Sequence, residues 1–458
     1  MSFPKYPAYK DSGVEWLGEV PAHWSITPLK FSASCNDTVL PESTDDDYEI
    51  EYVEISDVNE VSGITGSASY KFSDAPSRAR RMLQDGDVLI STVRTYLRAI
   101  APVVNPPENL IASTGFAVVR PRKGILDGAF LGYLLRAEWW ISEVIARSVG
   151  VSYPAINASD LIGLNIPVPA LQEQTQIARF LDHETARIDA LIEEQQRLIE
   201  LLKEKRQAVI SHAVTKGLDP TVPMKDSGVE WLGEVPAHWE VSKFGYISAV
   251  VRGGSPRPAG DPELFNGDYS PWVTVAEITK DEEIYLSETE TFLTRKGSVQ
   301  CRVFSKGTLL LSNSGATLGV PKILTMNANA NDGVVGFENI SLDKEYSYFY
   351  LSTLTQGLRE RAAGSGQPNL NTDIIKSIDV PIPPQPEVAE IVVAVKKLRE
   401  QFHSLSKTAA DGVRLLQERR SALISAAVTG KIDVRNWQPS AEQYPVGDTQ
   451  NRTEPEVV

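Results

Sequence analysis

The strongest constraint on the fold of this 458-residue chain is an exact internal repeat. The fifteen-residue segment KDSGVEWLGEVPAHW occupies positions 10–24 and recurs unchanged at 225–239, an offset of 215. Further on, AVTKGLD at 213–219 is matched by AVTGKID at 427–433, an offset of 214. Agreement at one nearly constant spacing predicts a tandem duplication. A chain of this length is also expected to form two or more domains.

The matched segments frame two interiors that have diverged. Weak similarity survives where YVEI at 52–55 parallels WVTV at 272–275, and where GDVLIS at 86–91 parallels GTLLLS at 307–312. Short apolar runs of this kind, bounded by glycine, predict buried strands. Similar frames around different interiors favour one fold that carries two different recognition surfaces. The tryptophans of the repeated segment are expected to anchor the core: Trp16, Trp24, Trp231 and Trp239.

Each half ends in a segment with the pattern of a long helix. Residues 171–212 contain no proline or glycine, and apolar residues recur from Ile177 at alternating steps of four and three. This pattern predicts a coiled coil. The second half repeats the pattern with an interruption at Gly412, which should weaken that helix locally. Two helices that each pack on their own domain are the alternative. The predicted interface residues are Ile177, Leu181, Ile188, Leu191, Leu198, Leu202 and Val209, followed by Ile391, Val395, Leu398, Phe402, Leu405, Leu416 and Leu423.

The duplication and the helices together predict an α+β fold. We expect two tandem domains separated by a pair of long antiparallel coiled-coil helices, with pseudo-twofold symmetry. The expected boundaries are a first domain at 1–168, a central helix at 169–215, a second domain at 216–382, a C-terminal helix at 383–430, and an acidic, flexible tail at 431–458.

Charge argues against a protein that holds nucleic acid by bulk attraction, because the formal net charge is −15. Three runs carry more than the whole acidic excess: 42–60 with a net charge of −9, 277–290 with −5 and 441–458 with −3. The remainder of the chain is therefore slightly basic, and a local surface that contacts phosphate is possible. The first two acidic runs are expected to face outward.

The sequence lacks the motifs of common enzyme sites. It has no phosphate-binding loop, no G-x-S-x-G turn and no H-E-x-x-H pair. NPPE at 105–108 resembles the start of an amino-methyltransferase motif, but a glutamate replaces its aromatic residue, so a proline-rich turn is expected. Cys35, Cys301 and five scattered histidines predict neither a disulfide framework nor a metal site. No run of 18 uncharged apolar residues occurs, so a cytoplasmic protein with no membrane association is expected. Because the enzyme motifs are also missing, no catalytic residues are expected.

Basic and polar residues that could contact nucleic acid fall at corresponding places in the two halves. Arginines precede and follow the strand predicted at 86–91, and a glycine-rich loop at 252–257 carries two more. Such residues can contact phosphates and read base edges; a solvated face with ordinary turn chemistry is the alternative. The candidate DNA-binding residues are Arg78, Arg80, Arg81, Arg94, Tyr96, Arg98, Tyr153, Arg252, Gly253, Gly254, Ser255, Arg257, Asn313, Ser314, Gln367 and Asn369.

Several motifs together resemble a known family. They are WLGEVPAHW in each half, GDVLISTVR at 86–94, WVTVAEI at 272–278 and NIPVPALQEQTQIARFLD at 165–182. The chain resembles, over nearly its whole length, the DNA-specificity (S) subunits of Type I restriction–modification enzymes.

The resemblance implies two target recognition domains that each read one half of a bipartite, asymmetric site in double-stranded DNA. The long helices would act as the spacer. It further implies two methyltransferase (M) subunits docked on the helical region and two motor–nuclease (R) subunits that join afterwards. S-adenosylmethionine, ATP and magnesium would bind those partners, and this non-catalytic chain would bind no cofactor.

Two other classes of function stay open. One is a duplicated coiled-coil adaptor that joins proteins without DNA binding, and the other is a fused enzyme with an unrecognised active site. Salt-dependent binding to a specific duplex separates a DNA-binding subunit from an adaptor. Methylation by the isolated chain would favour the enzyme.

Overall fold

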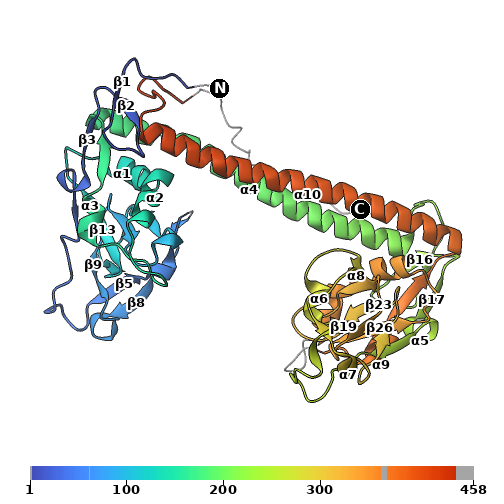
Figure 1. The fold of residues 1–458 in the computed structure, drawn as a ribbon. Coiled ribbons are helices and arrows are strands. Elements are labelled where there is room, and N and C mark those ends of the chain that lie inside the picture. The colour runs from blue at the N-terminus through green and yellow to red at the C-terminus, as the bar shows by residue number, and fades with distance from the viewer. Residues whose placement is uncertain (1–2, 61, 363–368, 440–458) are drawn as a thin grey trace. The chain divides into compact units, whose positions relative to one another are not determined.

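The computed structural model describes residues 3–60, 62–362 (Arg361 by its backbone alone) and 369–439. The chain forms two compact units (Figure 1). Unit 1 comprises residues 1–195 and 411–458, and unit 2 comprises residues 196–410. Both unit boundaries fall inside the long helices α4 (Leu171–Lys216) and α10 (Gln385–Val428). Each unit therefore holds one globular domain and one part of each long helix.

Two four-stranded sheets build the domain of unit 1. The first has the strand order β11-β10-β13-β4, and the second has the order β8-β5-β12-β9 with β5 and β12 parallel. The strands of these sheets are β4 (Ala33–Cys35), β5 (Glu49–Val53), β8 (Ala68–Lys71), β9 (Ala79–Met82), β10 (Val88–Ser91), β11 (Ile100–Pro102), β12 (Leu110–Ser113) and β13 (Phe116–Pro121).

Short pairs and helices complete unit 1. The additional strands are β1 (Tyr9–Asp11), β2 (Glu19–Pro21), β3 (Ser25–Pro28), β6 (Val58–Asn59), β7 (Gly63–Ile64) and β14 (Asn165–Val168), paired as β1-β2, β3-β14 and β6-β7. The helices are α1 (Gly128–Leu135), α2 (Glu138–Ala146) and α3 (Ala158–Ile162), with 3-10 turns at 29–31, 55–57, 72–74 and 95–97.

Unit 2 repeats this plan. Its sheets have the orders β18-β26-β23-β24-β20 and β21-β19-β25-β22, and β17 pairs with β27 as β3 pairs with β14. The strands are β15 (Met224–Asp226), β16 (Glu234–Pro236), β17 (Glu240–Lys243), β18 (Ala249–Arg252), β19 (Phe265–Val273), β20 (Tyr285–Leu286), β21 (Phe292–Leu293), β22 (Val303–Phe304), β23 (Leu309–Ser312), β24 (Pro321–Leu324), β25 (Ala328–Ala330), β26 (Val334–Glu338) and β27 (Asp379–Ile382). The helices are α5 (Phe244–Ile247), α6 (Val275–Thr279), α7 (Arg295–Ser298), α8 (Lys344–Ala362) and α9 (Thr372–Lys376).

The matching strand orders confirm the predicted duplication and the α+β fold class. The strands predicted at 86–91 and 307–312 are β10 and β23, which are buried on both faces. In β10, Val88 and Ile90 pack with the helices, while Leu89 packs against the second sheet. In β23, Leu309 and Leu310 divide in the same way. Two buried faces explain why these runs are continuously apolar rather than alternating.

A glutamate in the first turn of each long helix fixes that helix to its domain. In unit 1, Glu173 accepts hydrogen bonds from Trp24 Nε1 (3.0 Å) and Tyr6 Oη (2.7 Å), and it lies 2.8 Å from His23 Nε2. In unit 2, Glu387 accepts from Trp239 Nε1 at 2.8 Å and pairs with His238. The His-Trp pair closes the repeated segment in both halves, so both units use its last two residues for the same contact. Trp24 and Trp239 are core anchors as expected, whereas Trp16 is half-buried and Trp231 is 39% exposed.

The two long helices pair antiparallel within each unit (Figure 1). Early residues of α4 meet late residues of α10: the Arg420 guanidinium binds the Asp189 carboxylate in unit 1, with Nε–Oδ1 at 2.8 Å. In unit 2, Lys203 and Arg206 border one cavity with His403 and Ser406. The helix α10 runs through Gly412 without a break, and the local weakening expected there stays a prediction.

The predicted register of α4 is wrong by one residue over its middle. Leu191 and Leu198 are exposed, and the neighbouring Ile192 and Ile199 take the inward positions. After Leu181, the inward-facing positions of α4 are spaced first by four residues and then by three. The predicted spacing was three and then four. Leu405 of α10 is likewise exposed. The other predicted interface residues are buried or half-buried: Ile177, Leu181, Ile188, Leu202, Val209, Ile391, Val395, Leu398, Phe402, Leu416 and Leu423.

The C-terminal tail begins later than predicted. Residues 431–439 pack on unit 1: Val434 is buried, and Trp437 lies edge-on to Phe180 with ring centroids 5.2 Å apart. Gln176 Nε2 donates to the carbonyl oxygens of Val434 (3.1 Å) and Trp437 (2.7 Å). The predicted flexible tail at 431–458 is therefore wrong for 431–439, and its remainder lies outside the described residues.

As expected, most carboxylates of the second acidic run are exposed: Asp281, Glu282, Glu283, Glu288 and Glu290. Glu277 is buried, and the Glu282 carboxylate binds the Arg206 guanidinium of α4 at 2.8 Å. Asp281 binds Lys322, whose side chain is itself buried. Cations of unit 2 thus neutralise much of this run.

A charge at Ile199 is expected to destabilise unit 2, whereas a charge at its neighbour is not. Ile199→Asp places a carboxylate on the half-buried side of α4 and should lower the free energy of unfolding by about 2–3 kcal/mol. Leu198→Asp is the matched control and should change it by less than about 0.5 kcal/mol. Urea unfolding followed by circular dichroism measures both; an equal loss in the two variants would contradict the observed register.

The glutamate anchor should contribute more in unit 1 than in unit 2. Glu173→Ala leaves the Trp24 and Tyr6 donors buried without an acceptor and should cost about 3 kcal/mol. Glu387→Ala should cost about 1 kcal/mol, because that carboxylate is 37% exposed and the structure gives it two partners rather than three. Calorimetric unfolding of both variants tests this order, and a larger loss for Glu387→Ala would refute it.

Candidate nucleic-acid interface

In unit 1, the strand β10 ends at a loop whose backbone is held in an uncommon conformation. Arg94 and Arg98 have φ angles of +51° and +53° and flank the 3-10 turn at 95–97. Such angles are uncommon for residues other than glycine, so the surrounding structure must hold them. Thr92 Oγ1 donates to the Gly115 carbonyl oxygen at 2.8 Å, and Thr95 Oγ1 donates to Ser148 Oγ at 2.8 Å. The loop is therefore fixed at both ends.

A second loop, distant in sequence, joins the first. Val93 pairs with Ala155 as an antiparallel bridge, and the Arg94 guanidinium carbon lies 4.7 Å from the centroid of the Tyr153 ring. Tyr153 is 64% exposed, and several neighbours on these loops are also exposed. We call these residues the β10 edge surface: Arg94, Tyr96, Leu97, Val151 and Tyr153. It offers a cation, two phenol groups and apolar side chains to a partner.

The same backbone arrangement recurs in unit 2 with different side chains. Ser314 follows β23 and pairs with Asn369 as an isolated bridge, as Val93 pairs with Ala155. The loop after β18 lies beside it, because the turn at 331–333 contacts both segments. We call these residues the β23 edge surface: Arg252, Ser255, Arg257, Ser314 and Asn369.

The glycine-rich loop of unit 2 packs closely on that turn. A Cβ atom at Gly253 would lie 2.3 Å from the Asn331 carbonyl oxygen, so only glycine fits there. The Gly254 amide donates to the Ala330 carbonyl oxygen at 2.9 Å. Arg252 Nε and Ser255 Oγ donate to the backbone and the carboxylate of Asp332, at 2.6 and 2.9 Å. Arg257 is exposed, with its backbone amide bound to Gln300 Oε1.

Other candidates are engaged within the protein. Arg98 binds the Glu138 carboxylate through two hydrogen bonds of 2.7 and 2.8 Å and contacts Glu60 at 3.3 Å. The bond to Glu138 raises the pKa of the Arg98 guanidinium. Asn313 is fully buried, and its Nδ2 donates to the Leu370 carbonyl oxygen at 3.1 Å. Both side chains are thus engaged in contacts that position loops, and their contact with DNA stays a prediction.

The arginines before β10 fall into different environments. Arg78 is exposed, and its carbonyl oxygen accepts from the Thr114 amide beside the β10 edge surface. Arg80 lies over the Phe72 ring at 4.9 Å, and Arg81 is half-buried within β9. Gln367 lies outside the described residues.

Sequence reasoning missed some residues of both edges. Leu97 and Val151 are exposed apolar residues next to candidates, and the position of Leu97 between Tyr96 and Arg98 was an available signal for the first of them. The turn Asn331-Asp332-Gly333 holds the second edge together. Its composition is typical of a tight turn before a strand and could have been used.

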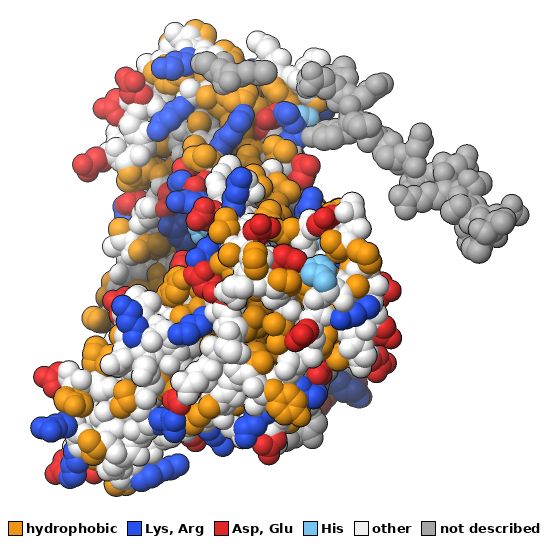
Figure 2. Space-filling model, turned by 90° about the vertical axis from the view of Figure 1, so that its right-hand side faces the viewer, with side chains coloured by type: hydrophobic (Ala, Val, Ile, Leu, Met, Phe, Trp, Pro, Cys, Tyr) orange, Lys and Arg blue, Asp and Glu red, His pale blue; other side chains and the backbone are white. Residues whose placement is uncertain are grey.

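Charge on one face of the molecule is mixed rather than gathered. On the face drawn in Figure 2, Lys and Arg side chains are interspersed with Asp and Glu side chains. Bulk attraction to phosphate is therefore weak, and contacts at defined positions must supply affinity.

Burial raises the pKa of the Cys35 thiol to about 11, so this cysteine stays protonated at neutral pH. Within the described ranges, no group of three His, Cys, Asp or Glu side chains could hold a metal ion. No helix in the part of the chain that the structure describes is long and apolar enough to cross a bilayer.

Comparison with known proteins identifies the family. Residues 31–202 and 236–410 each match the family described as "Type I restriction modification DNA specificity domain". MjaX of Methanocaldococcus jannaschii, whose name places it among type I restriction enzyme specificity subunits, is 24% identical over 92% of this chain and 96% of its own length.

Solved structures share the fold. A chain from a study of assembly and conformational transition of the type I R-M system has a TM-score of 0.73 at 22% identity, covering 89% of this chain and 98% of its own. The HsdS subunit of Thermoanaerobacter tengcongensis has a TM-score of 0.53 at 22% identity, covering 90% and 98%. With two matched domains that span most of its length, this chain belongs to the family of type I restriction–modification DNA specificity proteins.

Proposed function

We propose that this chain is a non-catalytic subunit that recognises a bipartite, asymmetric site in double-stranded DNA, each unit reading one half. One observation carries the proposal: two domains whose equivalent strands have the same order, with β20 added in unit 2, present different side chains at the same edge. The shared frame supports a shared task, and the different edges support two different base sequences. Selection on a shared catalytic centre would instead keep the edge residues alike.

The chemistry of the two edge surfaces suits base recognition. A guanidinium such as that of Arg94 can donate two hydrogen bonds to guanine in the major groove. In unit 2, Asn369 is exposed and carries the amide group that pairs with adenine. The exposed tyrosines can contact sugar and phosphate, and the glycine-rich loop allows a close approach of the backbone. The mixed charge favours specific contacts over general attraction.

The long helices are the proposed docking site for partner proteins. Large apolar side chains are exposed along them, including Leu191 and Leu415 in unit 1 and Leu198, Leu201 and Leu405 in unit 2. Exposed apolar residues in such number are typical of protein interfaces. We propose that two M subunits bind there and two R subunits join them in the cytoplasm. S-adenosylmethionine, ATP and magnesium then belong to those subunits.

The same exposed leucines would also suit the alternative function, a protein–protein adaptor that does not bind DNA. An adaptor would bind the partner subunits but show no preference among duplexes. Binding of the complex to DNA, measured across salt concentrations, decides between the two functions. A DNA-specificity subunit should bind its target duplex more tightly than other duplexes at every salt concentration, whereas an adaptor should bind all duplexes alike.

Deletion of the coding sequence tests the proposal in the host. Modified-base sequencing of genomic DNA with and without this chain should show the loss of one bipartite methylated motif, whose halves are the two targets. The DNA-specificity function would be rejected if the methylation pattern is the same in both strains while the M subunit is expressed and methylates DNA in the strain that lacks this chain.

Removal of the Arg94 side chain should weaken binding to that motif. Arg94→Ala is expected to cost about 1–3 kcal/mol through the loss of a paired contact to a base. Arg122→Ala is the matched control, because this exposed arginine follows β13 at the opposite end of β10 from Arg94. Fluorescence anisotropy at fixed salt, with M present, measures both; an equal loss in the two variants would indicate general electrostatics rather than base reading.

A further inference from the structure

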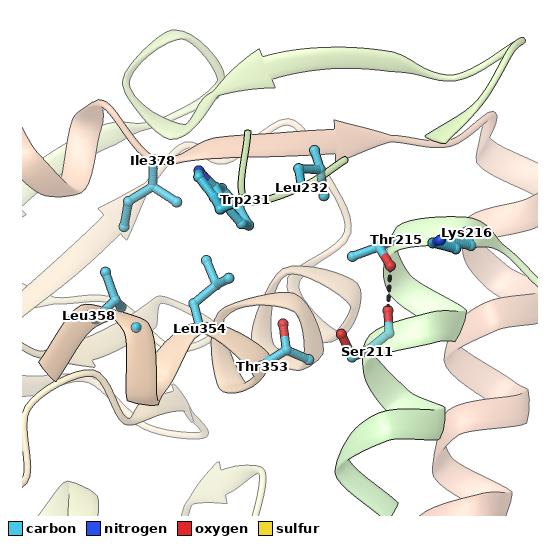
Figure 3. Close-up of a pocket in the computed structure, with 10 residues that line it drawn as sticks. Ser211, Thr215, Lys216, Trp231, Leu232, Thr353, Leu354, Leu358 and Ile378 are labelled. Atoms are coloured by element: carbon cyan, nitrogen blue, oxygen red, sulfur yellow. Dashed lines mark hydrogen bonds between the residues drawn. The ribbon is translucent and has the colours of Figure 1, made fainter. Parts of the chain in front are cut away.

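Helix α8 borders two cavities of different chemistry in unit 2. The cavity drawn in Figure 3 has a volume of about 390 Å³, with apolar residues such as Leu354 and Leu358 on its walls. Lys216 is the only charged residue among the described residues around it. The other cavity, of about 460 Å³, lies among α8, α4, α10 and the segments 279–282 and 317–322, and we call it the basic cavity. Five cationic residues and two acidic residues line it.

One face of α8 gives the basic cavity its length. Four residues of that helix recur at steps of four, three and four and line the cavity: Tyr348, Ser352, Thr355 and Arg359. The first and last of them lie roughly 16 Å apart along the helix axis, at the rise of an α-helix. Thr355 Oγ1 donates to the Gly319 carbonyl oxygen at 2.7 Å, which holds the segment 317–322 against the helix. The cavity is therefore elongated.

A buried lysine fixes another wall of the cavity. Lys322 of β24 is 1% exposed, and its ammonium group donates to the Asp281 carboxylate and to the carbonyl oxygens of Asp281 (3.3 Å) and Glu283 (2.5 Å). All three of its hydrogens are thus used, so Lys322 shapes the cavity and offers no donor to a ligand. The register of the strands makes Ala101 its equivalent in unit 1, so this wall is particular to unit 2.

Two guanidinium groups at the cavity have no carboxylate partner. The other three cations each form an ion pair with a carboxylate, at Asp281, Glu282 or Glu277. Arg359 and Arg399 form no ion pair with any carboxylate in the described part of the chain. The basic cavity therefore keeps two positive charges that the described residues do not neutralise.

The two arginines are held in place and keep donors for a ligand. Arg359 Nε donates to the Leu318 carbonyl oxygen at 3.1 Å, and Arg399 Nη2 donates to the Glu282 carbonyl oxygen at 2.7 Å. The Arg399 guanidinium carbon also lies 5.8 Å from the centroid of the Tyr348 ring. Because a guanidinium group carries five N–H donors, each arginine has donors left. The contacts with Leu318 and Tyr348 place the two groups toward opposite ends of the cavity.

Unit 1 has no counterpart of Arg399. The offset of 214 between the long helices pairs Arg399 with Thr185, which is buried and donates to the carbonyl oxygen of its own helix. The same offset pairs Arg206 with Arg420, and each of these binds a carboxylate of its own unit. The arginine that both units share is thus neutralised within the protein, whereas the arginine that unit 2 adds is not.

We propose that the basic cavity binds a small elongated polyanion, a ligand with more than one phosphate group. Two guanidinium groups at separate ends suit such a ligand, because arginine binds phosphate oxygens through paired, charge-assisted hydrogen bonds. The volume lies within the usual range of small-molecule sites, and a DNA duplex is too wide to enter it. The proposal is independent of the DNA-binding function, since none of the lining residues belongs to an edge surface.

Inorganic tripolyphosphate is the probe. Calorimetric titration into the full-length chain at fixed ionic strength should show saturable binding at one site. The affinity should exceed that for orthophosphate by more than about tenfold, because a second phosphate group on the same ligand reaches its arginine at high effective concentration. Equal affinities for the two anions would contradict an elongated site with a cation at each end.

Variants at both ends of the cavity identify the site. Arg359→Gln and Arg399→Gln should each weaken tripolyphosphate binding by about tenfold, through the loss of hydrogen bonds to a charged group. Lys216→Gln is the matched control, because it removes a cation from the cavity of Figure 3, and it should leave the affinity unchanged.

Thermal unfolding shows whether each variant is folded, and Arg359 is exposed, so its replacement should leave the fold intact. Absence of saturable binding to the unmodified chain would overturn the proposal. So would undiminished binding to folded Arg359→Gln, or an equal loss in Lys216→Gln, which would indicate general attraction to cations.

Discussion

A carboxylate in the first turn of each long helix is the contact on which the rest of the structure depends. Glu173 and Glu387 accept hydrogen bonds from the tryptophans of the repeated segment, and each sits where the helix dipole favours a negative charge. The contact fixes where the helix starts relative to its domain. In unit 1, loss of Trp24 would leave the buried Glu173 carboxylate without one of its donors, and the same contact recurs in unit 2 at a partly exposed carboxylate.

A fixed frame leaves the edges of the sheets free to vary. The central strands β10 and β23 are buried on both faces, so their sequences are confined to apolar residues. The loops that follow them share a backbone bridge but no side chains: Val93 with Ala155 in one unit, Ser314 with Asn369 in the other. Stability and recognition thus reside in different residues, and two recognition surfaces can diverge on one fold.

The sequence was informative where one local rule decides the structure, and it failed where contacts between distant segments decide. The duplication, the buried strands and both long helices follow from repeats and periodicity. The helix register was misjudged because Leu191 and Ile192 are equally apolar, and only the partner helix selects between them. Arg98 and Asn313 have the right chemistry for DNA, but Glu138 and Leu370, far along the chain, engage them. Neither pairing has a signal in a single sequence.

The acidic charge of the chain gives the proposed function its physical logic. With a net charge of −15 and mixed signs on the face drawn in Figure 2, attraction to arbitrary DNA is weak. Two small surfaces, each weak alone, gain affinity when one chain carries both, because binding of the first raises the effective concentration of the second. Only DNA that offers both half-sites receives that gain. Low general affinity and divergent edges therefore favour selectivity together, and the helices that join the units need no base contacts of their own.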